Sequence, residues 1–176
     1  MPSARGTLSW SPASERPDLL AAPVAAAVPT VDGALVAAID PGLADTAAFC
    51  AAYDVALAAS ANCVVVVGRR GERETYAAVM VLATDRADVN GVVRRHLDVR
   101  RISFAAHDEA VGRTGMEFGG ITPLGLPDGW PVLVDERVVD AGEVVIGSGI
   151  RGSKLLVPSS ALLALPGAQV LALTRA

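Results

Sequence analysis

Two glycine-rich stretches in the second half of the chain could do chemistry through their backbone. The first runs from Thr114 to Gly125, and the second, GSGIRG, runs from Gly147 to Gly152. A loop rich in glycine exposes backbone N–H groups, which can approach a ligand or stabilise an oxyanion. Each stretch can equally be a wide turn or a strand connection that meets no ligand. The residues alone leave both interpretations open.

The second stretch also matches the GxGxxG fingerprint of dinucleotide-binding sites letter for letter. Its surroundings do not fit that site, which needs a long helix after the last glycine and an acidic residue about 20 residues further on. The residues after Gly152 predict a strand that meets Pro158, and Glu143 is the last acid of the chain. We therefore reject a dinucleotide site at this position.

Side chains that usually form catalytic or metal centres are scarce and scattered. Cys50 and Cys63 stand alone, without a CxxC pair or a nearby histidine, so neither a metal site nor a disulfide framework is predicted. His107 is followed by an acid, but no GxSxG serine or reactive cysteine accompanies it, which argues against a catalytic triad. His96 lies among four arginines, a pattern typical of a solvated helix face and, less commonly, of a phosphate contact. Lys154 is the only lysine.

Composition indicates one well-packed globular domain, residues 18–176, preceded by a flexible N-terminal arm, residues 1–17. Of 176 residues, 52% are hydrophobic and 19% are charged, and a chain of this length buries roughly 70% of its unfolded surface. The net charge of −4 is spread without a broadly basic half, so any nucleic acid must be recognised locally. The longest apolar stretch, Leu19 to Val28, is too short to span a bilayer and follows acids, which predicts a cytoplasmic protein without a membrane partner.

The order of apolar runs, prolines and glycines predicts a mixed α+β organisation. A capping side chain followed by proline starts a helix expected over Asp40–Tyr53. The β-branched run Cys63–Val67 and the apolar run Thr75–Ala83 predict a buried hairpin at the centre of a sheet. Further helices are expected at Leu19–Val28, after Asp88, over Asp108–Gly115 and after Pro158, and further strands at Ala34–Ile39, Pro131–Val134, Glu143–Ile146 and Lys154–Val157.

Three blocks in the second half have the order and spacing found in a known family. They are TGMEFGGITPLG from Thr114 to Gly125, PVLVDE from Pro131 to Glu136, and VVIGSGIRGSKL from Val144 to Leu155. Together they resemble the YbaK and prolyl-tRNA-synthetase-associated deacylase family, over roughly residues 35–170. The resemblance implies a single α+β domain with a mixed, mostly antiparallel, barrel-like β-sheet and surrounding helices.

The same resemblance implies an activity. It is that of a free-standing, trans-editing aminoacyl-tRNA deacylase, which hydrolyses the ester of tRNA mischarged with a small amino acid and needs no cofactor. Selection among small amino acids by binding alone gives only about 10- to 200-fold per methylene, so hydrolysis of wrong products is the expected remedy. The implied partners are the acceptor end of aminoacyl-tRNA, an aminoacyl-tRNA synthetase and, in a homodimer, a second copy of the chain.

Individual residues take their candidate roles from this resemblance. The groups placed near the ester are Gly119, Gly120, Gly147, Ser148, Gly149 and Asn62. The residues placed around the substrate are Ile121, Thr122, Pro123, Asp135, Arg151 and Lys154. A structural, hydrogen-bonding role is the alternative for Asp135, and Asp88 fits a helix N-cap better than catalysis.

One position departs from the family. A lysine commonly starts its first hairpin strand, and here Asn62, or failing that Cys63, stands in its place. Asn donates a hydrogen bond but carries no charge, so stabilisation of a carboxyl or phosphate oxygen would weaken. Lys154 compensates only if its side chain turns into the pocket, and strand alternation leaves its direction open. Two other hypotheses stay open: a non-catalytic binding module for an aminoacyl ligand, and a structural partner that docks on a synthetase or on itself.

Overall fold

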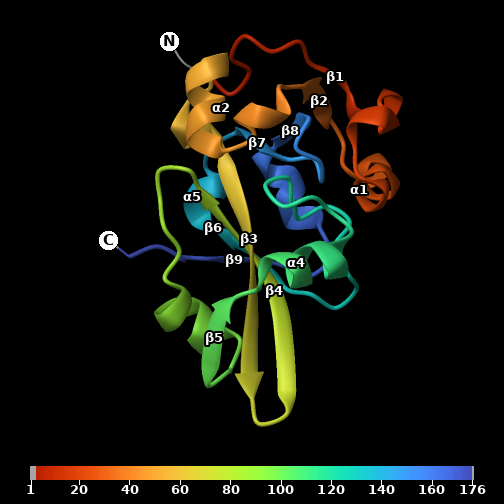
Figure 1. Ribbon diagram of the computed structural model, residues 1–176. Coiled ribbons are helices and arrows are strands. Elements are labelled where there is room, and N and C mark those ends of the chain that lie inside the picture. Colours follow the sequence, from red (N-terminus) through yellow and green to blue (C-terminus); the bar gives the residue numbers. More distant parts are fainter. Residues whose placement is uncertain (1–2, 176) are drawn as a thin grey trace.

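Two β-sheets with short helices around them form the computed structural model, which describes residues 3–175 (Figure 1). The first sheet is antiparallel, and its strands in spatial order are β1 (Ser11–Pro12), β2 (Leu35–Ala38), β8 (Ser153–Pro158) and β7 (Glu143–Gly147). The second has the order β5 (Arg101–Phe104), β3 (Ala61–Arg70), β4 (Arg73–Leu82), β6 (Val132–Asp135) and β9 (Ala168–Leu171). Its pairings of β4 with β6 and of β6 with β9 are parallel, and the others are antiparallel. The mixed, mostly antiparallel α+β prediction is confirmed.

The barrel-like part of that prediction is corrected. Within residues 3–175 neither sheet closes on itself, because β1 and β7 are the edges of the first sheet and β5 and β9 are the edges of the second. β6 and β9 extend the sheet away from β5 instead of returning to it. A bridge between Ser60 and Val145 links the two sheets where β3 begins.

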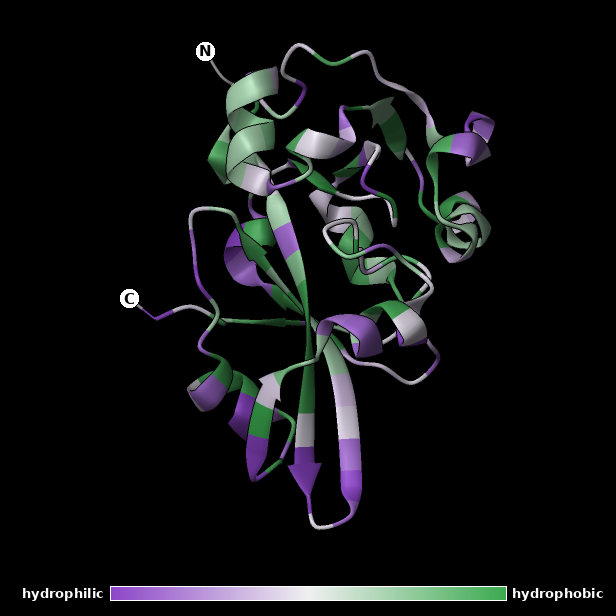
Figure 2. Cartoon of the chain, viewed as in Figure 1, coloured by the Kyte–Doolittle hydropathy of each residue, from purple (hydrophilic) through white to green (hydrophobic). Residues whose placement is uncertain are grey.

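The long hairpin of β3 and β4 lies at the centre of the second sheet, as its β-branched and apolar runs predict. Its two strands pair along their whole length and turn at Gly71, which has a φ of +60°. Residues 77–80 of β4 are fully buried, since alternate side chains enter two different hydrophobic clusters on the two faces of the sheet. Hydrophobic residues follow most of the hairpin, whereas its far tip is hydrophilic (Figure 2).

The α-helices are all short. They are α1 (Ala22–Ala27), α2 (Thr46–Tyr53), α3 (Arg94–His96), α4 (His107–Thr114) and α5 (Glu136–Val139). The single helix expected over Asp40–Tyr53 is instead a 3-10 turn at Pro41–Leu43 followed by α2. Two caps explain the break, because Asp40 caps the 3-10 turn at 2.9 Å and Asp45 caps α2 at 3.4 Å, each by accepting from a backbone amide.

Other expected helices are 3-10 or π turns. A π-helical turn at Val89–Val93 precedes α3, and the Asp88 side chain caps it by accepting from the amides of Gly91 at 3.0 Å and Val92 at 3.3 Å. The last helix is a 3-10 segment, Ser159–Ala164. Across the described part of the chain, no helix has the length and the apolar character needed to cross a membrane.

The segment expected to be a flexible arm lies against the first sheet over residues 3–17, and its first two residues lie outside the described ones. Within it, β1 pairs with β2, and Arg5 forms an ion pair with Glu143 at 2.6 Å. The indole Nε1 of Trp10 donates to the carbonyl oxygen of Arg5 at 2.8 Å. The structure therefore places this segment on the surface of the domain.

Candidate functional site

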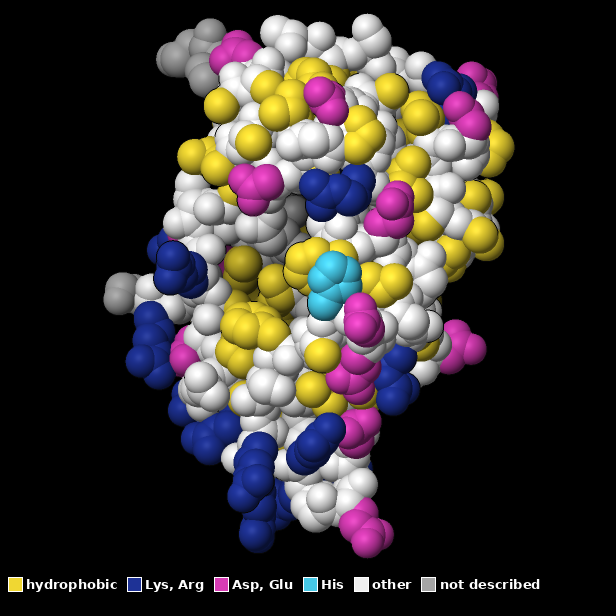
Figure 3. Space-filling view, viewed as in Figure 1, with side chains coloured by type: hydrophobic (Ala, Val, Ile, Leu, Met, Phe, Trp, Pro, Cys, Tyr) yellow, Lys and Arg dark blue, Asp and Glu magenta, His cyan; other side chains and the backbone are white. Residues whose placement is uncertain are grey.

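A cavity of about 710 Å³ opens where the two sheets meet. Its wall includes the start of α2, the first half of β3, the end of β5 with α4, the start of β8 and the two glycine loops. Figure 3 shows it as a hollow near the middle of the molecule, with hydrophobic side chains in its lower wall. Segments far apart in the sequence thus meet around one space.

The structure brings some of the predicted site residues to this cavity and leaves others behind it. Those that line the cavity are Asn62, Gly119, Ile121, Gly147 and Lys154. Those that do not line it are Gly120, Thr122, Pro123, Asp135, Ser148, Gly149 and Arg151. The residues of the second group act by holding the glycine loops and strand ends in position, as described below.

The two glycine loops pack backbone against backbone. A Cβ on Gly147 would lie 2.5 Å from the carbonyl oxygen of Gly120 and 2.7 Å from that of Ile121, and a Cβ on Gly120 would lie 2.7 Å from the carbonyl oxygen of Ile150. Gly149 has a φ of +90° and donates its amide to the carbonyl of Gly120 at 2.7 Å. Glycine is required here because a side chain would push the loops apart.

Some backbone amides of these loops donate hydrogen bonds within the protein, and others remain free to bind a ligand. The amide of Gly120 donates to Glu117 O at 2.9 Å, and that of Gly149 to Gly120 O, so neither is available to a ligand. Within the described part of the chain, the amide of Gly119 has no hydrogen-bond acceptor. The amides of Phe118 and Ile121 also have no acceptor there, and both residues line the cavity beside Gly119, so the first loop offers three donors to an oxyanion.

Buried serines fix the second loop from behind. Ser148 is fully buried, and its Oγ donates to backbone carbonyls, among them Ser153 O at 3.2 Å. The hydroxyl of Ser153 lies 2.6 Å from that of Ser148 and 2.5 Å from the carbonyl oxygen of Leu19. This network ties the loop to the segment before α1, so Ser148 acts on the shape of the loop rather than on a ligand.

Lys154 turns into the cavity, which answers the question that strand alternation left open. Its side chain is 92% covered, its Nζ donates to the carbonyl oxygen of Ala44 at 3.0 Å, and it lies 5.2 Å from the ring centre of Phe49. Burial lowers the pKa of Lys154, and the nearby positive charge of Arg151 acts in the same direction, while Asp45 opposes it. An ammonium group has three donors, so two remain for a ligand.

Asn62 lies near the start of β3, and the oxygen of its side-chain amide already accepts a hydrogen bond. Its Oδ1 accepts from the hydroxyl of Thr46 at 2.6 Å, which leaves the NH₂ group to donate into the cavity. Asp45, the residue before Thr46, also lines the cavity and is the only carboxylate among the described residues of its wall. Asp45 was not predicted as a site residue, because its place beside a cation depends on tertiary structure.

Arg151 and Asp135 hold loops and strand ends. The guanidinium of Arg151 donates to Phe118 O at 3.3 Å and to Pro41 O at 3.2 Å, so it ties the first glycine loop to the turn before α2. Asp135 is fully buried, and its two oxygens accept from the amides of Arg137 at 3.0 Å and Leu173 at 2.8 Å. Both carboxylate oxygens of Asp135 are therefore occupied by backbone at the end of β6.

Thr122 and Pro123 lie in the buried layer behind the cavity wall. Thr122 has no exposed surface, its amide contacts the sulfur of Met116 at 3.5 Å, and its Oγ1 finds no partner among the described residues. Pro123 is buried as well. These residues shape the loop that carries Gly119 and Ile121.

Two aromatic side chains and a histidine at the mouth were not predicted as site residues. Phe104 is 62% exposed and Phe118 is 50% exposed, although both are large and apolar. The ring of His107 stacks on Phe118 with 4.2 Å between centroids, and all three side chains line the cavity. Exposure of an aromatic residue depends on how the loops fold, so sequence alone carries no signal for it.

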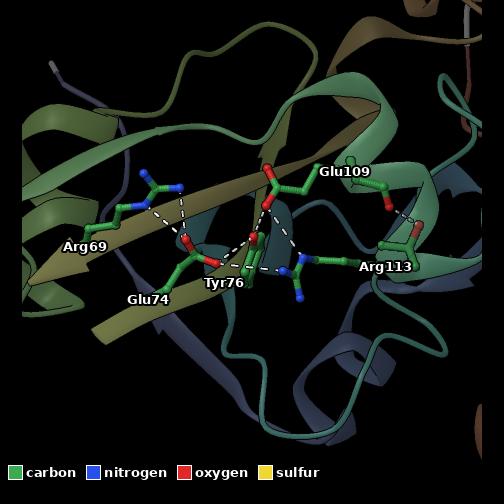
Figure 4. Close-up of polar contacts among 7 residues, drawn as sticks. Arg69, Glu74, Tyr76, Glu109 and Arg113 are labelled. Atoms are coloured by element: carbon green, nitrogen blue, oxygen red, sulfur yellow. Dashed lines mark hydrogen bonds and ion pairs between the residues drawn. The ribbon is translucent and has the colours of Figure 1, made fainter. Parts of the chain in front are cut away.

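A network on α4 holds the side of the cavity formed by His107 and Ala110 (Figure 4). The Tyr76 hydroxyl of β4 donates to Glu74 at 2.9 Å and contacts Glu109 of α4. The Tyr76 ring lies between Trp130, at 5.2 Å, and the guanidinium of Arg113, at 4.2 Å. Burial, together with these carboxylates, raises the pKa of Tyr76 to about 12. The network fixes α4 to the central hairpin.

The chain is similar to known proteins over most of its length. Residues 40–165 match the family described as "Aminoacyl-tRNA editing domain". A crystal structure of a candidate trans-editing enzyme for prolyl tRNA synthetase is similar, with 24% identity, a TM-score of 0.75, and coverage of 96% of this chain and 100% of that one. Among curated proteins no match is found.

Two more solved structures share the fold. One comes from computational grafting of epitopes onto scaffold proteins, with 23% identity, a TM-score of 0.76, and coverage of 89% of this chain and 97% of that one. The other is a hypothetical protein, with 21% identity, a TM-score of 0.67, and coverage of 75% and 85%. At such identities the likeness establishes the fold.

Proposed function

The chain belongs to the aminoacyl-tRNA editing domain family, and from that premise we propose that it is a free-standing deacylase for tRNA mischarged with a small amino acid. The observation that carries the proposal is the cavity that gathers Lys154, Asn62 and Gly119 from three separate segments. The similar trans-editing enzyme is described as one for prolyl tRNA synthetase, which makes prolyl-tRNA synthetase the first candidate for the enzyme whose errors are corrected.

The charges of the cavity suit an aminoacyl ester. Such a substrate has an α-ammonium group next to a carbonyl whose oxygen becomes negative during attack. Among the described residues of the wall, Asp45 supplies the one carboxylate and Lys154 the one ammonium. We assign the α-ammonium group to Asp45 and the developing oxyanion to Lys154 and the amide of Gly119, with the Asn62 amide as a further donor.

Hydrolysis needs only water and these donors. The oxygen of water attacks the carbonyl carbon, the ester C–O bond breaks, and its electron pair leaves on the ribose oxygen. The proton that water loses passes to that oxygen, with the neighbouring ribose hydroxyl available as a relay. Each well-placed oxyanion donor contributes about 10²- to 10³-fold in rate, so the loop amide and one ammonium together suffice for an activated ester.

The apolar part of the cavity lining suits a small apolar side chain on the substrate. Alanine is the commonest residue in this lining, at positions Ala44, Ala47, Ala61, Ala83, Ala105 and Ala110. Val65 and Cys63 complete the floor along β3. Burial raises the pKa of Cys63 to about 12, so its thiol acts as a small apolar surface and not as a nucleophile.

A panel of charged tRNAs tests the proposal. The full chain is incubated with alanyl-, cysteinyl-, seryl- and prolyl-tRNA, and loss of the ester is followed against buffer alone. Faster loss with at least one of them is expected, and no acceleration with any of them would refute the proposal. Micromolar binding without turnover would instead favour the binding-module hypothesis.

A further inference from the structure

A second hollow adjoins the cavity on the side of β5. It measures about 590 Å³ and is lined by residues 84–90, Phe104 and Arg175. Phe104 lines both hollows, and Ala83 of the cavity wall is followed directly by Thr84 of the second hollow. One exposed aromatic ring therefore stands between a mostly apolar cavity and a polar hollow.

Four exposed arginines between residues 86 and 101 have unoccupied guanidinium groups. Arg86 lines the second hollow, Arg95 lies on α3, Arg101 begins β5, and Arg100 directly precedes it. Within residues 3–175 none of the four side chains has a hydrogen bond or an acid within ion-pair distance, whereas nine other ion pairs are formed. Their charge is thus available to a partner.

The acids of the same hollow are neutralised within the protein. Asp85 pairs with Arg137 at 3.0 Å, and Asp88 pairs with Arg175 at 2.8 Å. Residues 61–104 hold eight arginines and five acids, a net charge of +3, while the rest of the chain carries the remaining −7 of the total of −4. Figure 3 shows Lys and Arg side chains gathered along one flank and the lower part of this face.

We propose that Phe104, the second hollow and Arg86, Arg95, Arg100 and Arg101 receive the unpaired 3′ end and first acceptor-stem phosphates of tRNA. The inference rests on the proposed function, because the ester in the cavity fixes where the RNA begins. The terminal adenine stacks on Phe104, the preceding nucleotide enters the second hollow, and the arginines contact phosphates. Stacking of bases on an exposed aromatic ring beside cationic side chains is how single strands are commonly bound.

The spacing along β5 fits this path. From Phe104 to Arg101 the strand rises about 10 Å, at about 3.3 Å per residue. Stacked nucleotides rise about 3.4 Å each, so Arg101 lies about three nucleotides from the base on Phe104. The unpaired end of a tRNA consists of the discriminator nucleotide and CCA, so Arg101 lies beside the last unpaired nucleotide before the double-stranded stem. A protein partner is less well matched, since it would have to bring acids to four separate guanidinium groups.

Binding of an uncharged RNA hairpin with an acceptor stem and a CCA end tests the role of Phe104. Phe104→Ala is expected to weaken binding by about 5- to 150-fold, the usual range for losing one base stack. Phe104→Trp should keep the affinity, and Phe104→Leu, which is apolar but cannot stack, should lose most of it. Leu163→Ala removes another exposed apolar side chain, one that lines neither hollow, and serves as the control.

The salt dependence of binding tests the arginines. Arg100→Gln with Arg101→Gln should weaken binding and lower the slope of log Kd against log salt by about 0.7–0.9 per lost contact. The matched control is Arg5→Gln with Arg16→Gln, which changes the net charge equally but removes arginines already paired with acids. Equal affinity and slope in both double variants would overturn the proposal.

The outcomes separate this proposal from the function it rests on. Ester hydrolysis that continues while Phe104 and arginine variants bind RNA normally would leave the deacylase intact and reject the docking path. If those variants instead changed the mass in light scattering, the face would belong to a second copy of the chain, and the proposal would fail. Absence of any hydrolysis together with variant-sensitive RNA binding would reject the deacylase and keep the surface.

Discussion

Around the cavity, backbone packs on backbone, whereas along β5 side chains reach into solvent. Gly120, Gly147 and Gly149 meet carbonyl groups or side chains within 2.4–2.7 Å of where a Cβ would stand. At the other region, Arg95, Arg100 and Arg101 are exposed and without partners in the described part of the chain. The first region is tightly packed and has few charges, and the second presents these unpaired charges at the surface.

This difference separates two tasks. A site that stabilises a developing charge needs donors held rigidly, because preorganised groups do not reorganise during the reaction. A surface that follows a phosphate backbone needs charge at approximate positions, since such contacts position the RNA without reading it. Changes at the cavity should therefore affect chemistry and stability, and changes at β5 should affect affinity.

The largest effect is expected from Gly147→Ala. Its Cβ would lie 2.5 Å from one backbone oxygen and 2.7 Å from another, so the loops must separate. We expect a loss of about 1–3 kcal/mol in the free energy of unfolding, measured with urea, and loss of ester hydrolysis. Gly112→Ala is the control, because nothing lies within 4 Å and alanine in α4 should add about 0.5–1 kcal/mol. Equal stability of the two variants would contradict the packing account.

Lys154→Met should give the next largest effect, on rate and not on folding. Methionine keeps the length and apolar packing, so stability should stay nearly unchanged, while single-turnover hydrolysis falls by about 10²- to 10³-fold. Adding Asn62→Lys to this variant returns an ammonium to the cavity and should restore part of the rate. A rate equal to that of the unsubstituted protein in Lys154→Met alone would remove Lys154 from the chemistry.

A smaller effect is expected in how the free energy of unfolding depends on pH. Because burial lowers the pKa of Lys154, the unfolded chain keeps that proton to about pH 10.4 while the folded chain loses it earlier. Between these two pKa values the unfolded state binds more protons, so the Lys154 contribution to stability rises with pH, by at most about 1.4 kcal/mol per unit.

Urea unfolding at several pH values, compared between the protein and Lys154→Met, measures this contribution. Tyr76 acts oppositely, since a pKa raised to about 12 makes stability fall from about pH 10 upward. It acts equally in both proteins and cancels in the comparison. A stability difference that is flat across the alkaline range would contradict the burial of a charged Lys154.

The smallest effect is expected from Arg70→Gln at the hairpin tip. Arg70 pairs with Asp98, but their side chains are 46% and 71% exposed. Exposed pairs contribute about 0–1 kcal/mol, so urea unfolding should shift little and hydrolysis should not change. A large loss of either would show that the exposed region shares the rigidity of the cavity.

Much of the fold could be predicted because it follows from local patterns. The β-branched run after Cys63 placed the central hairpin, and Asp88 placed a cap. Closure of the sheet could not be predicted, because it depends on which edges β6 and β9 join. The break between the 3-10 turn and α2 was not predicted, because Asp40 and Asp45 lie close together and each caps its own element.

Of the site, sequence could identify the loops but not which of their groups face a ligand. Gly119 and Gly147 line the cavity, whereas Gly120 and Gly149 use their amides within the loops. The direction of Lys154 depends on register in β8, and the exposure of Phe104 depends on where α3 ends and β5 begins. Both features depend on tertiary structure, and no local sequence pattern predicts them.

A crystal structure with 3′-(L-alanylamino)-3′-deoxyadenosine, whose amide replaces the reactive ester, tests the central claim most directly. We predict the alanyl carbonyl oxygen within hydrogen-bond distance of Lys154 Nζ and the Gly119 amide, and the adenine stacked on Phe104. An alanyl group bound outside the cavity, or bound within it with its carbonyl turned away from both donors, would contradict the account.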